Sequence, residues 1–237
     1  MQPRNLFARA TTKFLLVLAF AFVGAYSGFG QAQNQPPQPA ARRAGRQIPP
    51  PQYIPAHDYD QRDIKLDLRF DWDLERAIGT ATITLAPVVK DLSRVDFDAA
   101  YMSVSGAALA SGTALKWEND VTKEKITVLL DRAYQPSEEL TIVISYHTNQ
   151  PPPDKRAGLG GGGLNFIKPR DDDPKRPRQI WSQGEAETNH LWFPCFDHPN
   201  DFATSEIFAT VEKPLSVISN GKLVEVKENS DGTRTFD

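Results

Sequence analysis

The stretch Ile64-Lys-Leu-Asp-Leu-Arg-Phe-Asp-Trp72 alternates apolar and charged side chains, and Ala77-Ile-Gly-Thr-Ala-Thr-Ile-Thr-Leu85 continues with the same period of two. Successive side chains of a β-strand point to opposite faces of a sheet, so this period indicates two half-buried strands. Only residues 73–76, Asp-Leu-Glu-Arg, separate them. The two stretches are therefore predicted to form an antiparallel hairpin with one buried face.

Short runs of the same character follow along the chain, separated by turn residues at regular intervals. Strands are predicted at Arg94–Phe97, Met102–Val104, Leu115–Trp117, Ile126–Leu130 and Leu140–Tyr146. Outside the first thirty residues, no stretch combines helical spacing with helix caps. The expected fold is all-β, a sandwich or open barrel of mostly antiparallel strands.

The end of the chain has the pattern of one further hairpin. Leu223–Val226 and Thr233–Phe236 are predicted strands, and Asp231-Gly232 between them is a strong turn signal. Because the return strand stops after four residues, we expect the 57–237 domain to be C-terminally incomplete.

Residues 154–178 are expected to form a loop region. The run Gly160–Gly163 lacks the Gly-Lys-Ser/Thr ending of a phosphate-binding loop, so a mobile loop is predicted instead. The triplet Asp171–Asp173 does not alternate as calcium ligands do, which favours a solvated charge run.

The first 56 residues differ in composition from the rest. Residues 1–30 combine basic residues with the apolar run Phe14–Tyr26, which indicates a secretory signal peptide. This run is shorter than the roughly 20 residues that span a bilayer, so no stable membrane insertion is expected after cleavage, and an uncleaved anchor is the alternative. Residues 31–56 are rich in Pro, Gln and Arg, which predicts a disordered linker. The protein is expected to be exported, to the periplasm or beyond the cell.

Charge is distributed unevenly. Six of the 27 basic residues but none of the 30 acidic ones lie before Tyr53, which leaves 21 basic against 30 acidic residues and a net charge of about −9 in the rest. This balance argues against nucleic acid as a partner, because phosphate contacts need a basic patch. It is compatible with a cationic ligand such as a peptide amino terminus.

The residue types that build common catalytic centres are sparse. The single cysteine, Cys195, is expected to be a buried structural thiol. None of the four histidines (His57, His147, His190 and His198) pairs with another at the i, i+4 spacing of a zinc helix. The nucleophile elbow Gly-x-Ser-x-Gly is also missing. We therefore predict neither a catalytic residue nor a metal site or cofactor site within these 237 residues.

One segment does carry a pattern with chemical meaning: Trp181-Ser-Gln-Gly-Glu-Ala-Glu-Thr-Asn-His-Leu-Trp-Phe-Pro-Cys-Phe-Asp-His-Pro199. It places Glu185 among four aromatic residues, Trp181, Trp192, Phe193 and Phe196. A carboxylate in a half-dry aromatic cleft favours a cation, and a protonated amine bound by charge-assisted hydrogen bonds is a fitting guest. A solvated surface carboxylate is the alternative.

The segment from Gln179 to Glu206 resembles the aminopeptidase N family of zinc metallopeptidases, and a weaker similarity extends from Tyr59 to Phe236. The resemblance implies the N-terminal domain of such an enzyme. In that case Glu185 would bind the α-amine of a peptide substrate, Gln183 would contact the peptide near its first residue, and the Glu185–Ala186 peptide bond would be cis. Asp197 and Pro199 would be structural members of the turn, and His198 stands where the family often has Glu.

The resemblance also implies what is missing. The zinc ligands of the family lie in a His-Glu-x-x-His helix, which does not occur in this sequence. Zn²⁺ would belong to the full-length enzyme, and the chain would be a substrate-anchoring piece that needs a separate C-terminal catalytic domain. Two other functions stay open. One is a non-catalytic relative that serves as a protein-interaction scaffold. The other is an exported β-sandwich that binds carbohydrate through Trp181, Trp192 and Phe193.

Overall fold

The computed structural model describes residues 57–152 and 161–237. The predicted signal peptide (1–30) and linker (31–56) lie outside the described residues, as does Gly160. Within the two described ranges, no helix is long and apolar enough to cross a bilayer. The regular structure there is almost entirely β, with one short 3₁₀ helix, η2, at Asn189–Leu191.

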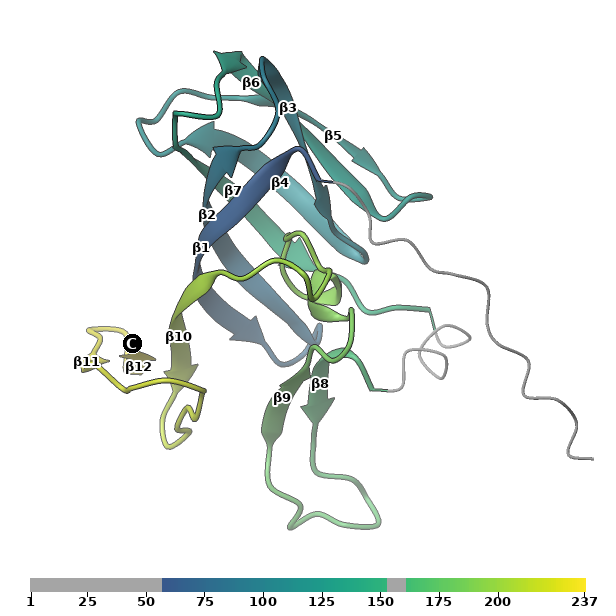
Figure 1. Cartoon of the computed structure of the whole chain (residues 1–237). Helices are drawn as coiled ribbons and strands as arrows, with labels where there is room; N and C mark the ends of the chain where they lie inside the picture. The colour runs from purple at the N-terminus through teal and green to yellow at the C-terminus, as the bar shows by residue number, and fades with distance from the viewer. Residues whose placement is uncertain (1–56, 153–160) are drawn as a thin grey trace, which may run out of the picture. The chain divides into compact units, whose positions relative to one another are not determined.

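The largest element is a seven-stranded sheet with the order β11-β12-β10-β1-β2-β7-β4 (Figure 1). A three-stranded sheet has the order β3-β6-β5, and a ribbon consists of β8 and β9. All pairings are antiparallel except that of β1 with β10. The bounds are β1 Tyr59–Asp71, β2 Arg76–Pro87, β3 Leu92–Asp98, β4 Met102–Leu109, β5 Lys116–Asp120, β6 Lys125–Tyr134, β7 Leu140–Thr148, β8 Gly163–Ile167, β9 Gln179–Gln183, β10 Thr204–Glu212, β11 Val226–Glu228 and β12 Thr233–Phe236.

The predicted hairpin is confirmed as β1 and β2, which lie at the centre of the large sheet. Ile64 pairs with Ile83, and Leu66 pairs with Ala81. Inward positions of both strands are buried and alternate with partly exposed ones, as the sequence period predicts. The connection turns at residues 72–75, where Glu75 has a φ of 50°.

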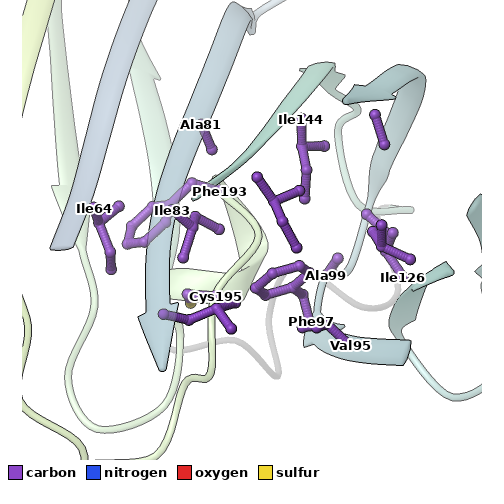
Figure 2. Close-up of a cluster of buried hydrophobic side chains, with 14 of the residues drawn as sticks. Ile64, Ala81, Ile83, Val95, Phe97, Ala99, Ile126, Ile144, Phe193 and Cys195 are labelled. Atoms are coloured by element: carbon purple, nitrogen blue, oxygen red, sulfur yellow. The ribbon is translucent and has the colours of Figure 1, made fainter. Parts of the chain in front are cut away.

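The core lies between the large sheet and the three-stranded sheet, which confirms a sandwich rather than a closed barrel. Ile83 and Ile144 come from the large sheet, whereas Val95, Phe97 and Ile126 come from the small one, and all five are at most 1 % exposed. Figure 2 shows these side chains meeting in one cluster. Phe193 and Cys195 join the same cluster, so the segment that carries the sequence motif is part of the core.

Three strands, β8, β9 and β10, lie where the sequence pattern does not place them. The prediction of a loop over residues 154–178 is wrong at Gly163–Ile167, which forms β8 and pairs with β9. The strand begins within the glycine run, at Gly163, whose φ is 78°. Glycine has no side chain, so no alternation of apolar and polar residues marks this start. The strand β10 is not predicted either. Its mixed sequence shows no clean alternation, and its position is determined by parallel pairing with β1.

The C-terminal hairpin is confirmed with a shift in its first strand. That strand, β11, occupies Val226–Glu228 rather than Leu223–Val226. The turn signal is correct, since Gly232 has a φ of 84°, a left-handed conformation that glycine adopts readily. The Asp171–Asp173 run is exposed, as predicted, and Arg170 pairs with Asp172 at 3.1 Å.

Candidate functional site

The motif segment leaves β9 at Gln183 and turns at once. The N–H of Thr188 donates to the carbonyl oxygen of Gly184 (3.0 Å), and its hydroxyl donates to the carbonyl oxygen of Gln183 (2.8 Å). The Glu185–Ala186 peptide bond is cis, as the family resemblance implies. At Gly184 an added Cβ would lie 2.1 Å from Oδ1 of Asn189, so the turn closes tightly over a residue without a side chain. We call residues 184–189 the site turn.

After the site turn, the chain is fixed to the sandwich by backbone and side-chain hydrogen bonds. Cys195 forms an antiparallel bridge with Asp98 of β3, with N···O distances of 2.7 and 3.1 Å. The N–H of Phe196 donates to Oε1 of Gln61 on β1 (3.1 Å), and the Tyr146 hydroxyl donates to the carbonyl oxygen of Trp192 (3.0 Å). Strands of both sheets therefore hold this segment, which gives the site turn a rigid base.

Cys195 is a structural residue, as predicted. Its side chain is 2 % exposed within the core cluster. Burial raises the pKa of the thiol well above its usual value, and the nearby carboxylates of Asp197 and Asp98 add to this effect. A thiol that stays protonated is a poor nucleophile, which fits a structural role for Cys195.

Glu185 lies at a concave surface but is not enclosed. Its side chain is exposed and lines a hollow of about 420 Å³. Gln183 is half-buried and lines an adjoining hollow of about 860 Å³. The two hollows share Gly184 and Asn189 of the site turn as walls. Glu185 and Gln183, the two residues predicted from the sequence, thus line neighbouring parts of one surface depression.

The aromatic residues do not form the common wall around Glu185 that the sequence predicts. Phe193 and Phe196 line the smaller hollow but belong to the core. Trp192 lines only the larger hollow and packs edge to face on Phe193, with ring centroids 4.5 Å apart. Trp181 is 44 % exposed and lines neither. The reason is that Trp181 lies on β9 of the ribbon, which ends at Gln183, before Glu185. Trp192, Phe193 and Phe196 follow the site turn and pack in or against the core.

The smaller hollow is rich in carboxylates. Besides Glu185, it is lined by Asp197 and Asp201, whose side chains are each 5 % exposed. Burial raises the pKa of Asp201, although the N–H of Gln61 donates to its Oδ2 at 3.1 Å. Neither Lys nor Arg is among the described residues that line this hollow. Its charge therefore favours a cationic guest.

The comparisons with known proteins identify the family of this chain. The family model of the peptidase M1 N-terminal domain matches residues 55–237. This chain belongs to that family. Among solved structures, the M1 domain is similar to an M1 zinc metallopeptidase from Deinococcus radiodurans, with a TM-score of 0.59 and 22 % identity over 76 % of this chain and 38 % of that one. A mutant of the Deinococcus enzyme bound to a Tyr-Ser-Ala substrate matches with a TM-score of 0.60 and 23 % identity, at the same coverage of both chains.

Other relatives of the M1 domain carry different names. Yeast LTA4 hydrolase in complex with bestatin matches with a TM-score of 0.56 and 18 % identity, over 76 % of this chain and 26 % of that one. Transcription initiation factor TFIID subunit 2 of Gallus gallus is 32 % identical over 72 residues, which is 30 % of this chain and 6 % of that protein. This chain thus spans 38 % or less of each of these relatives. At these identities, the structural matches establish the fold.

The described residues of the M1 domain do not form a site for zinc. Across that part, His, Cys, Asp and Glu side chains nowhere gather in a group of three or more that would hold a metal ion. His190 and His198, which flank the Pro-Cys turn in sequence, have separate partners. Nδ1 of His190 lies 2.6 Å from Oδ2 of Asp197, whereas Nε2 of His198 lies 3.3 Å from Oε1 of Glu187.

Two residues of the hollow escape prediction from the sequence. Asp201 follows the motif and is brought back to it by its hydrogen bond with Gln61 of β1. Gln61 leaves no signal in the sequence, because the alternation of Ile64, Leu66 and Leu68 would place it on the outward face. A register shift between Gln61 and Asp63 turns it inward, where it is 4 % exposed and its side chain accepts the N–H of Phe196, the kind of partner that a buried polar group needs. The identity of that contact depends on the tertiary fold.

Proposed function

We propose that this M1 domain anchors the amino terminus of peptide substrates for a zinc-dependent aminopeptidase. Zinc and its ligands would come from a separate catalytic domain, because no group of metal ligands occurs among the residues described. The observation that carries the proposal is the hollow in which Glu185 stands beside Asp197 and Asp201 without a lining Lys or Arg. Family membership and the solved relative that holds a Tyr-Ser-Ala substrate support it.

The chemical role of Glu185 in this proposal is to recognise the chain end. A free peptide terminus brings an ammonium group, which a carboxylate binds by charge-assisted hydrogen bonds. A blocked terminus brings a neutral amide and leaves the carboxylate unpaired, which costs binding free energy. A fixed anion at this position therefore selects free amino termini. Gln183, which opens into the adjoining larger hollow, would contact the peptide near its first residue.

Glu185→Gln tests this role directly, since it removes the charge and keeps the shape. In the complete enzyme that the proposal requires, we expect kcat/KM for an unblocked peptide to fall about 10²-fold, or about 2.7 kcal/mol. The matched control is Glu187→Gln, because Glu187 lies on the same turn, is exposed and is not part of the hollow lining. It is expected to keep kcat/KM within about threefold, a change of roughly 0.6 kcal/mol.

The isolated chain gives a second readout. An unblocked dipeptide is expected to shift the amide resonances of the site turn in the wild-type chain, and its N-acetylated form is not. If Glu185→Gln leaves kcat/KM unchanged, or if blocked and unblocked peptides shift the same amides equally, Glu185 does not bind the amine.

A non-catalytic scaffold is the second candidate function, and the match to TFIID subunit 2 favours it. Zinc content and peptidase activity of the complete protein separate the two, since the scaffold predicts neither. The carbohydrate alternative is less favoured, because Phe193 is 8 % exposed and packs in the core with Trp192 against it, which leaves Trp181 as the well exposed aromatic of the three. Export also stays a proposal, and it depends on residues 1–30. Detection of a mature chain outside the cytoplasm would test it.

A further inference from the structure

An imidazole–carboxylate pair, His190 and Asp197, joins the site turn to the small sheet, and the proposed function makes no use of its imidazole. His190 follows the site turn directly, and its side chain is 18 % exposed. Its backbone N–H and its ring Nδ1 both reach Oδ2 of Asp197, at 2.9 and 2.6 Å. Its carbonyl oxygen accepts the N–H of Ala100 at 2.9 Å. Three hydrogen bonds, two to Asp197 and one from Ala100, therefore hold His190 at the point where the site turn meets the sandwich.

The charged groups around this imidazole come from four parts of the chain: the motif segment, β3, the β5–β6 turn and β6. Asp197 belongs to the motif segment and is buried, and its own N–H donates to Oδ2 of Asp98 on β3 (3.1 Å). Glu124 stands in the turn between β5 and β6, with Oε2 3.7 Å from Nε2 of His190. Lys125 on β6 pairs with Oδ1 of Asp98 and offsets that charge. The imidazole thus faces more negative than positive charge.

Protonation changes the number of partners that the ring has. Neutral His190 with a proton on Nδ1 keeps its hydrogen bond to Asp197 but has no proton to offer to Glu124. Protonated His190 donates from both nitrogens and bridges the two carboxylates. Burial disfavours the charged ring, but the hydrogen bond to Asp197 and the charges of Asp197, Asp98 and Glu124 outweigh it and raise the pKa of His190.

We propose that His190 is a pH-sensitive clasp that holds the site turn against β3 and the β5–β6 turn when its ring is protonated and loosens that attachment when it is neutral. The consequence for substrates depends on the proposed function. A peptide α-amine itself has a pKa of about 8. A rise in pH would then weaken amine binding in two ways, because the guest loses its charge and the turn that presents Glu185 is held less firmly.

The direction of the effect on stability follows from linkage. The folded-state pKa of His190 lies above its ordinary value of 6.5. The clasp therefore stabilises the folded protein fully below that ordinary pKa, and its contribution disappears as the pH rises through the folded-state pKa. The pH window of the effect opens at about 6.5 and extends upward.

NMR of the 237-residue chain, without peptide, tests the clasp. His198 is a second imidazole beside the site turn, because it contacts Glu187, so the measurement uses the His198→Gln variant. We expect the ring resonance of His190 to titrate with a midpoint above 6.5, and the amides of residues 184–189 to follow the same midpoint. Glu124→Gln removes one charge partner from a half-exposed position and is expected to lower that midpoint with the chain still folded. Asp197→Asn is expected to lower it further.

Three results would overturn the proposal: a His190 midpoint at or below that of an unfolded chain, site-turn amides that do not follow His190, or a midpoint unaffected by Glu124→Gln. Because no peptide is present, failure of the proposed amine binding leaves this test intact. Adding an unblocked dipeptide above and below the midpoint then separates the two ideas. Amides that titrate with His190 but do not respond to the dipeptide support the clasp and contradict the amine site.

Discussion

Replacing Phe97 with alanine is expected to destabilise the protein by about 3–5 kcal/mol, the range for deleting a large aromatic from a packed core. Phe97 is fully buried where the small sheet meets the large one (Figure 2). Its ring packs at an angle on Tyr59, with centroids 5.7 Å apart. The cavity left by alanine would lie between two sheets that are each fixed by their own hydrogen bonds, so neither can collapse into it easily.

The measurement is urea unfolding of the two chains, followed by tryptophan fluorescence. Phe202→Ala is the matched control, because Phe202 is 87 % exposed and the same atoms are removed. Its free energy of unfolding is expected to change by no more than about 0.5 kcal/mol. Equal losses in the two variants would show that the space between the sheets is not the packed core of this domain.

Loss of the Phe97 side chain would also disturb the geometry of the candidate site. The next residue, Asp98, bridges to Cys195 through its backbone and accepts the N–H of Asp197 through its side chain. A strand that shifts to fill a cavity at Phe97 would move these contacts and with them the base of the site turn. Packing of the core and geometry of the hollow are therefore coupled through two adjacent residues of β3.

The parts of the fold that follow from the sequence are those in which local pattern and tertiary environment agree. The stretch from Ile64 to Leu85 alternates because one face of each strand is buried, and the hairpin it predicts is at the centre of the sheet. Strand β10 has no such agreement, since several of its apolar residues are only partly buried. Its place beside β1 comes from a parallel pairing that joins residues some 140 positions apart. No local pattern carries that information.

The candidate site shows the same division. Glu185 and Gln183 can be named from the motif and the family resemblance, and both line the depression. The polar surroundings of Asp201 and His190 depend on contacts with β1, β3 and the β5–β6 turn, which the sequence does not reveal. The prediction of an aromatic wall around Glu185 is wrong, because Trp192, Phe193 and Phe196 pack in or against the core and Trp181 is exposed on β9.

Gly79→Ala is expected to be the most damaging small substitution in the domain, with a loss of more than about 3 kcal/mol in the free energy of unfolding, beyond the usual range for an overpacked core. Gly79 pairs with Leu68 across the central hairpin. A Cβ added there would lie 1.8 Å from the carbonyl oxygen of Asp67 and 2.9 Å from its carbonyl carbon. These are backbone atoms, so no side-chain rotation relieves the contact.

The two strands also have no freedom to separate. On its other side β1 pairs with β10, and β2 pairs with β7, so a displacement at Gly79 disturbs hydrogen bonds on both flanks of the hairpin. Gly106→Ala is the matched control, since Gly106 also lies in a strand, β4, but has open space where the Cβ would go. That variant is expected to be neutral or up to about 1 kcal/mol more stable, because alanine restricts the unfolded chain. Urea unfolding of both variants decides the matter: if Gly79→Ala unfolds at the same midpoint as Gly106→Ala, the close approach of β1 and β2 at this position does not exist.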